Sequence, residues 1–411
     1  MYGEGKMSFV DPMQADKLLG VFRVVSGLKD AIVVVHSPVG CHWGINYIQR
    51  LSYRKTNSTV SALRERSVIF GGHEHLKKSI EILFKNKKKD KYLIILCASV
   101  PSIIGDDIEG IISESSVSDV SYLVFDCGGY KGKMMEGYEE ALEGLFSWIE
   151  EKKKENDSFL VNIIGIQRDL PMGEANIKEI KRMLSLFGIK VNSIFPPERI
   201  KEIKDASRAD LNIVFGYGRG LAERMKERFG IPYIFFEEYP YGISLCERFL
   251  RRVAKQFGIS EKRTEKVLQR EKRRILNALK PAHMYLHTLY DLPVSVSGDP
   301  AQVKGISCFL TKELGCRIKL INTSSFDDYS YLSEKVLIQA SMHEFEKNID
   351  DVELIFGSET EKTISKKKNI PLIQFSYPIF SRIFLNDAPY MGFKGTAVLV
   401  EEIINQILCQ L

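Results

Sequence analysis

Three cysteines lie where they could ligate a metal or an iron–sulfur cluster. Each follows a short apolar run that has the length and composition of a buried strand, and the three are Cys41, Cys97 and Cys127. In open α/β sheets, ligand sites form at the carboxyl ends of the strands, where loops converge. Thiolates supplied by separate loops at such an edge suit soft metals and iron–sulfur clusters. A lone buried cysteine in a loop is also a common packing residue, so this alternative stays open.

The remaining cysteines are expected to be small buried residues in helices, at a strand start or in the C-terminal tail. They are Cys246, Cys308, Cys316 and Cys409. The sequence contains no CxxC pair, which removes the main support for a zinc ribbon or a thioredoxin-like site. The total of 7 cysteines is odd and no export signal is visible, so a disulfide framework is not expected.

Short apolar runs alternate with amphipathic, helix-period segments along the whole chain, which is typical of an α/β fold. The runs predicted as strands are residues 31–35, 92–96, 122–125, 160–166, 191–195, 211–215, 233–236, 294–297, 318–321, 352–356 and 372–375. Strand–helix–strand units favour parallel pairing, so we expect several doubly wound sheets.

The length of 411 residues is too great for one hydrophobic core, because single cores stop growing near about 250–300 residues. A charged stretch at residues 150–157 and the end of a basic helical segment at residues 260–288 indicate two boundaries. We therefore predict three α/β domains, at residues 1–156, 157–290 and 291–411, each of ordinary domain size.

The charge pattern and hydropathy exclude several classes of protein. The net charge is only +5, and the basic runs at residues 85–91, 152–154 and 366–368 lack the aromatic side chains of a nucleic-acid site. The basic segment at residues 262–274 is interpreted as an exposed helix face, with a partner-docking surface as the alternative. No apolar run approaches the ~18 residues of a membrane span, and the N-terminus lacks a signal-like apolar stretch. We expect a cytoplasmic protein that binds neither nucleic acid nor a membrane.

Longer segments around Cys41 and Cys97 resemble component 1 of nitrogenase and its relatives. They read LLGVFRVVSGLKDAIVVVHSPVGC at 18–41, SVIFGGHEHLKKSI at 67–80 and ILCASVPSIIGDDIEG at 95–110. Further matches follow in order at residues 215–233, 296–321 and 376–403, and the last two are most similar to the β-type chain. The resemblance implies the nitrogenase component 1 fold, with three doubly wound Rossmann-like domains and mainly parallel sheets.

The resemblance also implies an iron–sulfur cluster at a subunit interface, with Cys41 and Cys97 at two of its ligand positions. A third ligand position falls at Asp16 or its neighbours; we favour a surface or helix-capping role for Asp16, with ligation as the alternative. Cys127 lies outside the matched set, so packing is favoured over ligation. Because one chain supplies two matching thiolates, a [4Fe–4S] cluster shared between chains is favoured over a larger eight-iron, P-cluster-like group. His36 belongs to the family pattern and is expected to support the Cys41 loop through a hydrogen bond.

The family relationship implies partners as well as a cofactor. The chain is expected to form a homodimer, or a heterodimer or heterotetramer with a paralogous component 1 subunit, and to receive electrons from a homodimeric, ATP-hydrolysing iron protein. The implied activity is ATP-dependent reduction of a substrate bound between domains, of tetrapyrrole or organosulfur type. The alternative is a β-type scaffold for cofactor assembly or a non-catalytic partner subunit. The sequence identifies no catalytic residue.

Two stretches argue against an iron–molybdenum cofactor in this chain. The nitrogenase α subunit anchors that cofactor through a cysteine in its second domain and a histidine in its third. The matching stretches here read VFGYGRG at 214–220, with Gly216 near the cysteine position, and FSYPIF at 375–380, without a histidine. The sequence also lacks a complete GxGxxG fingerprint and a GxxxxGK[ST] loop, so neither a nicotinamide nor ATP is expected to bind.

Overall fold

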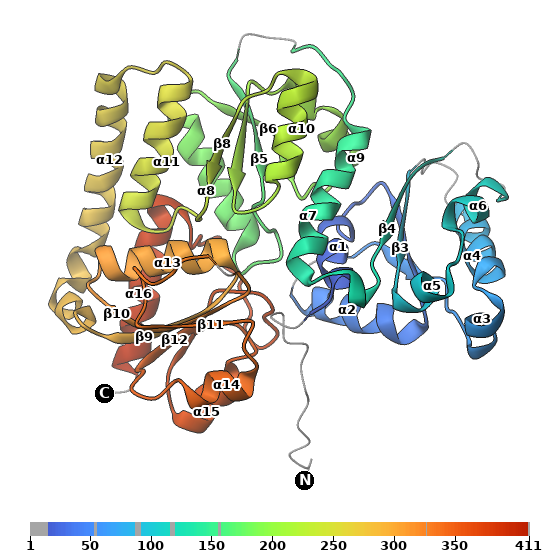
Figure 1. Ribbon diagram of the computed structural model, residues 1–411. Helices are drawn as coiled ribbons and strands as arrows, with labels where there is room; N and C mark the ends of the chain where they lie inside the picture. The colour runs from blue at the N-terminus through green and yellow to red at the C-terminus, as the bar shows by residue number, and fades with distance from the viewer. Residues whose placement is uncertain are drawn as a thin grey trace.

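The computed structural model of the chain describes residues 15–52, 56–86, 92–115, 120–154, 158–325 and 327–409. It contains three separate sheets, and every strand pair within them is parallel. One sheet falls in each of the three predicted units, and the units meet around a common centre (Figure 1). The predicted α/β class with several parallel sheets is confirmed.

The first sheet has the order β2-β1-β3-β4. Its strands are β1 (Ile32–His36), β2 (Ser58–Val60), β3 (Tyr92–Cys97) and β4 (Ser121–Asp126). Alternate residues of β1 and β3 face two different cores, one formed with α1 (Lys17–Val25) and α7 (Met134–Gly144), the other with α4 (His73–Asn86) and α6 (Ile108–Ser113). Glycine is required where α1 meets α7, because a Cβ on Gly20 would lie 1.8 Å from the Met134 carbonyl oxygen.

The second and third sheets have the orders β6-β5-β7-β8 and β11-β10-β9-β12-β13. The strands of the second are β5 (Leu160–Ile164), β6 (Lys190–Phe195), β7 (Leu211–Phe215) and β8 (Tyr233–Phe236). Those of the third are β9 (Pro293–Gly298), β10 (Arg317–Thr323), β11 (Lys335–Ile338), β12 (Leu354–Gly357) and β13 (Leu372–Gln374). Their inner strands are mostly buried, as expected for parallel strands covered on both faces, and they bury polar residues such as Asn162, Asn212 and Ser295 along with the apolar ones.

The helices of these two units form a shared layer on the left of Figure 1. They include α8 (Gly173–Ser185), α11 (Gly242–Gln256), α12 (Glu261–Leu279), α13 (Pro300–Lys312) and α16 (Gly392–Leu408), whereas α10 (Arg219–Phe229) lies on the other side of the second sheet and contacts α7. The C-terminal helix α16 packs against α8, α11 and α12 of the second unit. The basic helix α12 buries Thr264, Leu268, Glu271 and Ile275 and exposes most of its cations, which confirms the expected exposed face.

Several expectations are tested by this structure. All of the strands predicted from apolar runs are present, but β2 and β11 were not predicted. Cys246 and Cys316 are buried, as expected. The expectation of burial is wrong for Cys409, which is exposed at the end of α16, and for Cys308, which is partly exposed on the outer side of α13. Residues 155–157 of the charged stretch and 87–91 of the first basic run lie outside the described residues, and the two domain boundaries stay a prediction. In the part of the chain that is described, no helix has the length and apolar character needed to cross a bilayer.

Candidate functional site

The carboxyl edge of the first sheet brings the predicted cysteines together. His36, Cys97 and Asp126 are register partners at the ends of β1, β3 and β4. The next residue, Cys127, donates its N–H to the Cys97 carbonyl oxygen at 2.8 Å. Cys41 lies in the first turn of α2 (Val39–Leu51), which begins just after β1. The edge therefore carries thiols from the connections that follow three adjacent strands of the sheet, β1, β3 and β4.

These thiols differ in exposure. Cys41 is exposed, Cys97 is 5% exposed and Cys127 is fully buried, where its Sγ lies 3.4 Å from the Phe125 carbonyl oxygen. Partial burial, and then the charge of Asp16, raise the pKa of Cys41. Burial, followed by the charges of Asp126 and Asp106, raises the pKa of Cys97 to about 12. Both thiols are thus protonated at neutral pH, and ligation of a metal would have to displace their protons.

Asp16 lies at the same edge as the cysteines. It precedes α1, its side chain makes no capping hydrogen bond to that helix, and its backbone forms an isolated bridge with Lys133. Its carboxylate lies against Gly129, where an added Cβ would be 2.9 Å from Asp16 Oδ2 and 3.3 Å from Ser99 Oγ. The expected capping hydrogen bond is therefore absent at Asp16. The carboxylate is directed toward the loops that follow β3 and β4.

A hydrogen-bond network around His36 stabilises this edge of the first sheet. His36 is fully buried, with Nδ1 2.8 Å from Ser61 Oγ and Nε2 3.0 Å from Asp106 Oδ2. Asp106 also accepts the backbone N–H of Gly72 at 2.9 and 3.0 Å. Three stretches far apart in sequence, HSPVGC, FGG and IGDD, are joined through these contacts. The side-chain partners of His36 are thus Ser61 and Asp106 and not residues of the Cys41 loop; the link to that loop is indirect, because Ser61 Oγ also accepts the Ser37 N–H at 3.1 Å.

Two other histidines of this region, His42 and His73, have local partners. His42 Nε2 lies 3.0 Å from Ser58 Oγ, and His73 Nε2 lies 3.1 Å from the Glu114 carboxylate.

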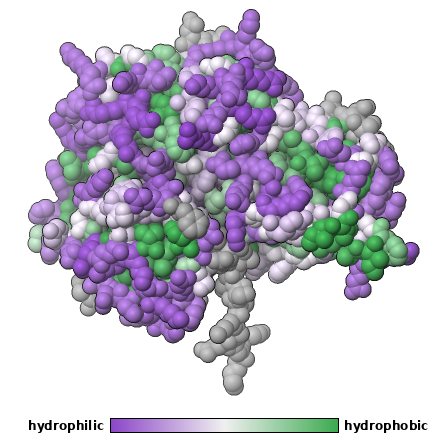
Figure 2. All heavy atoms as spheres, viewed as in Figure 1, coloured by the Kyte–Doolittle hydropathy of each residue, from purple (hydrophilic) through white to green (hydrophobic). Residues whose placement is uncertain are grey.

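A stripe of exposed apolar residues lies on α2, the helix that also carries the exposed Cys41. On α2, Val39, Trp43 and Tyr47 are 54%, 64% and 46% exposed and recur every four residues, so they form one stripe. The Trp43 and Tyr47 rings are stacked with centroids 5.2 Å apart. Further exposed apolar residues lie on α3 (Glu65–Phe70) and α5 (Ser99–Ile104), where Figure 2 shows the strongest apolar patch on this face: Val68, Ile69, Phe70 and Ile103. Exposed apolar patches of this kind mark protein–protein contacts.

One chain does not complete a metal site at this edge. Within the described ranges, no three His, Cys, Asp or Glu side chains are arranged to hold a metal ion. Cys41 and Cys97 supply two thiols at one edge of the sheet. Thiols suit an iron–sulfur cluster, but two are too few to complete the usual set of four ligands.

Side chains fill the centre where the three units meet. Arg23 of α1 is 2% exposed and binds the Asp169 carboxylate through two nitrogens, at 2.8 and 2.9 Å. Gln167 accepts a further hydrogen bond from Arg23 at 2.7 Å, and the Tyr377 ring lies 4.0 Å from the guanidinium carbon. The space left beside them is only about 20 Å³. Tyr377 of the FSYPIF stretch therefore lies against the buried guanidinium group of Arg23.

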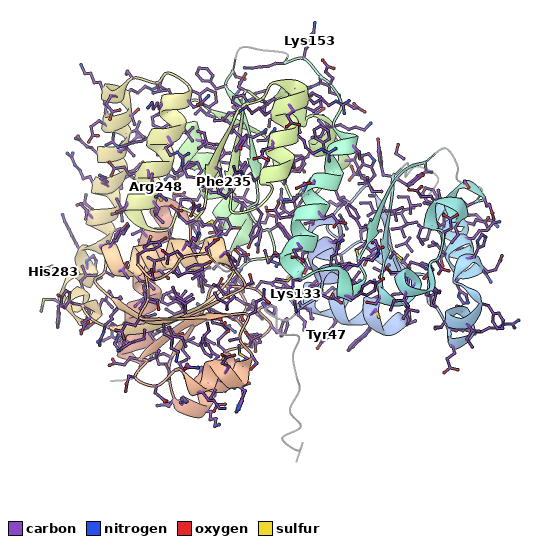
Figure 3. All side chains as sticks on the ribbon, viewed as in Figure 1. Tyr47, Lys133, Lys153, Phe235, Arg248 and His283 are labelled. Carbon is purple, nitrogen blue, oxygen red and sulfur yellow. The ribbon has the colours of Figure 1, made fainter. Side chains whose placement is uncertain are left out.

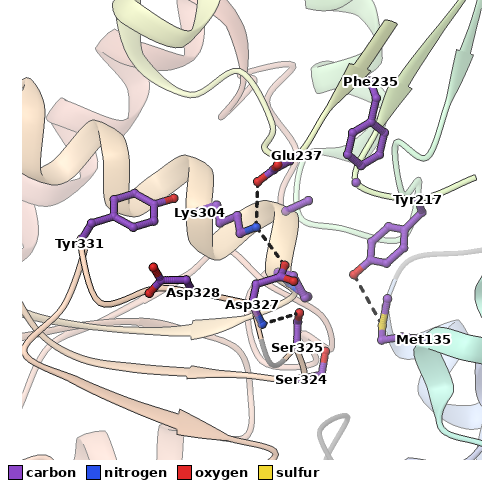
Figure 4. A pocket seen from close by; sticks show the side chains of 13 residues that line it. Met135, Tyr217, Phe235, Glu237, Lys304, Ser324, Ser325, Asp327, Asp328 and Tyr331 are labelled. Carbon is purple, nitrogen blue, oxygen red and sulfur yellow. Dashed lines mark hydrogen bonds and ion pairs between the residues drawn. The ribbon is translucent and has the colours of Figure 1, made fainter. Parts of the chain in front are cut away.

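A larger cavity of about 640 Å³ lies between the second and third sheets (Figure 4). It is lined by residues at the carboxyl ends of β7, β8 and β10 and by the first turns of α13. Figure 3 shows Phe235 on β8, above α13 in that view. The lining residues are Met135, Gly216, Tyr217, Phe235, Glu237, Pro300, Ala301, Lys304, Ser324, Ser325, Asp327, Asp328 and Tyr331. Carboxyl ends of parallel strands are the usual ligand-binding positions of α/β sheets.

The sequence alone indicated few of these functional neighbours. Gly72 and Asp106 belong to the FGG and IGDD motifs, but nothing in their spacing showed that they meet His36. Lys304 and Glu237 lie in different units, and no local pattern singles them out.

Comparisons with known proteins agree over nearly the whole chain. The sequence pattern described as nitrogenase component 1 type oxidoreductase matches residues 17–408. The nitrogenase molybdenum-iron protein beta chain of Methanococcus maripaludis is 24% identical, with 98% of this chain and 95% of that protein covered. A light-independent protochlorophyllide reductase subunit of Ephedra altissima is 27% identical, with 94% and 82% covered. Among solved structures, "Nitrogenase Cp1 at pH 6.5" has a TM-score of 0.82 at 20% identity, with 99% and 95% covered, which shows a common fold.

Proposed function

The chain belongs to the family of nitrogenase component 1 type oxidoreductases, and on that premise we propose that it is one subunit of a two-component, ATP-dependent reductase. In this proposal a separate iron protein supplies the electrons. The substrate is of the tetrapyrrole or organosulfur type and binds between the second and third sheets. The similar proteins from Methanococcus maripaludis and Ephedra altissima are named as one chain or one subunit of an enzyme, which supports a role within a multi-chain complex.

The observation that carries the proposal is the pair of thiols at the edge of the first sheet. Cys41 is exposed on the first turn of α2, the helix that also carries the exposed stripe of Val39, Trp43 and Tyr47, and Cys97 ends β3. We propose that the two thiolates hold half of a [4Fe–4S] cluster, with the other half from a second copy or a paralogous chain. Such a cluster supplies electrons one at a time at low potential. Asp16 is the further ligand candidate, and the buried Cys127 supports the Cys97 loop through its backbone.

This chain's own residues have three tasks in that arrangement. The His36–Asp106–Gly72 network holds the Cys41 and Cys97 connections in register. The apolar stripe on α2 excludes water from the interface around the thiols. The exposed side chains on α3 and α5 offer a surface on which the iron protein docks.

One observation favours a second candidate function, a non-catalytic or scaffold subunit. The centre of the three units is filled by Arg23, Asp169 and Tyr377, so a large cofactor has no room there. A β-type chain that only completes the interface cluster would need no such room. Turnover with an iron protein and ATP supports the reductase, whereas transfer of a bound cluster to another protein without turnover supports the scaffold.

The decisive experiment is anaerobic purification, alone and with the closest paralogous chain, followed by iron and acid-labile sulfide analysis. A shared [4Fe–4S] cluster gives about four irons per dimer and an electron paramagnetic signal after reduction with dithionite. Cys41→Ser and Cys97→Ser should each abolish both. Cys409→Ser is the matched control, because that thiol is exposed but lies at the far end of α16. Iron-free protein in both preparations would refute the proposal.

A further inference from the structure

The cavity between the second and third sheets carries more negative than positive charge. Lys304 Nζ lies 3.0 Å from Glu237 Oε2 and 2.9 Å from Asp327 Oδ2. Burial alone would lower the pKa of Lys304, but the two carboxylates more than offset this effect and raise it. One ammonium shared by two carboxylates leaves one negative charge in excess. Asp328, on the same loop as Asp327, adds a second negative charge. Its carboxylate accepts hydrogen bonds from Ser330, and this neutral residue does not cancel the charge.

These charges face one open space. Glu237, Lys304, Asp327, Asp328 and Tyr331 all line the cavity. The Glu237 side chain is 63% exposed, while that of Lys304 is only 9% exposed. Figure 4 shows Lys304 held between Glu237 and Asp327. A ligand in the cavity would therefore meet carboxylate oxygens before it met the ammonium.

The rest of the lining is apolar or aromatic. Met135 and Phe235 contribute apolar surface. The Tyr217 hydroxyl is engaged by Asp299 at 2.5 Å, so this residue offers its ring. Arg219 lies over the Phe235 ring but is paired with Glu223 at 2.9 Å, so it adds no net charge. Aromatic faces beside carboxylates are the usual recognition elements for organic cations.

We propose that this cavity binds a small organic cation with an apolar or aromatic body and rejects ligands that carry carboxylates. The inference rests on the proposed function, because it takes the cavity as the substrate site. The volume of about 640 Å³ lies within the usual range of small-molecule sites. Of the two proposed substrate classes, a cationic or neutral organosulfur compound fits the lining. The carboxylates of a tetrapyrrole would face Glu237, Asp327 and Asp328.

The test is calorimetric titration of the full chain at low ionic strength with two probes, tryptamine and indole-3-propionate. Both have an indole ring and a short tail, but one ends in an ammonium and the other in a carboxylate. We expect tryptamine to bind about tenfold more tightly, and the difference to shrink in high salt. Equal binding, tighter binding of indole-3-propionate, or binding of neither probe overturns the inference.

Three variants distinguish the effect of the charges in the cavity on tryptamine binding from the effect of the net charge of the protein. Asp328→Asn should weaken tryptamine binding several-fold, and Lys304→Gln should strengthen it, because removing the ammonium frees two carboxylates. Glu334→Gln is the control: this carboxylate pairs with Lys319 outside the cavity, so the same change in net charge should leave binding unaltered. An equal effect of Glu334→Gln and Asp328→Asn contradicts the proposal. If Lys304→Gln does not fold, the tryptamine affinity of Asp328→Asn still tests the proposal, because Asp328 lies on an exposed loop.

Failure of this inference is distinguishable from failure of the proposed function. Turnover with an iron protein in a chain that shows no preference for tryptamine removes the cation specificity alone. A clear preference for tryptamine without cluster or turnover removes the reductase and leaves a cation-binding cavity.

Discussion

His36 joins three distant segments of the first unit, and its burial makes that connection sensitive to pH. Burial lowers the pKa of His36, although the Asp106 carboxylate acts in the opposite direction. In the unfolded chain a histidine gains a proton near pH 6.5. As pH falls through that value, the unfolded state binds a proton that folded His36 does not, so stability is lost by up to about 1.4 kcal/mol per pH unit. Urea unfolding across this range should show a shallower pH dependence for His36→Asn than for the wild-type chain. Identical slopes would contradict the prediction.

Gly72 has no space for a side chain. An added Cβ would lie 2.5 Å from Asp106 Oδ2 and 2.8 Å from His36 Cε1. We expect Gly72→Ala to lower the free energy of unfolding by about 1–3 kcal/mol, because the network must move to relieve the overlap. Gly44→Ala is the control, since no atom lies within 4 Å of its added Cβ and alanine favours the helix α2. The midpoints of urea unfolding measure both effects. Equal destabilisation by Gly72→Ala and Gly44→Ala would contradict the prediction.

At the scale of elements, the apolar composition of the strands explains which of them could be predicted. The inner strands are apolar runs bounded by glycine, proline or aspartate, so their positions could be read from the sequence. The two missed strands, β2 and β11, each pair with a single neighbour at a sheet edge. Such short edge strands carry polar residues, and their pairing depends on a partner elsewhere in the chain. Helix α16 belongs to the third unit by sequence. Its packing against helices of the second unit could not be predicted either, because this packing also depends on a partner elsewhere in the chain.

Asn176 of α8 fixes the start of α16. Its side-chain oxygen accepts the backbone N–H groups of Tyr390 and Met391 at 2.8 and 3.0 Å, and the residue is 1% exposed. Asn176→Ala leaves two buried donors without this acceptor, so we expect a loss of about 1–3 kcal/mol in the free energy of unfolding. Hydrogen exchange at the N-terminus of α16 should quicken in the variant. Asn277→Ala on the exposed face of α12 should change neither quantity measurably.

At the scale of the whole molecule, the candidate site depends on how the units pack together. The thiol positions at strand ends followed from the sequence, because parallel strands end at one edge. The neighbours of Lys304 did not, since Glu237 follows a strand of the second sheet and Asp327 a strand of the third. The contact of Arg23 with Asp169 and Tyr377 likewise joins all three units. Packing between units therefore determines both the filled centre and the open cavity.

Arg23 gives the last prediction, because its pair with Asp169 is buried where the three units meet. Replacing one partner leaves the other charge buried, so Arg23→Met should cost about 3–5 kcal/mol of unfolding free energy. Arg23→Met combined with Asp169→Leu should cost less than the sum of the single changes, because the double variant leaves no lone charge. Arg219→Met, which breaks an exposed pair with Glu223, should cost no more than about 1 kcal/mol. Urea unfolding of the wild-type chain, the two single variants Arg23→Met and Asp169→Leu and the double variant completes the cycle, with Arg219→Met measured beside it. If Arg23→Met costs no more than Arg219→Met, the network does not hold the units together, and the apolar contacts between them must do so alone.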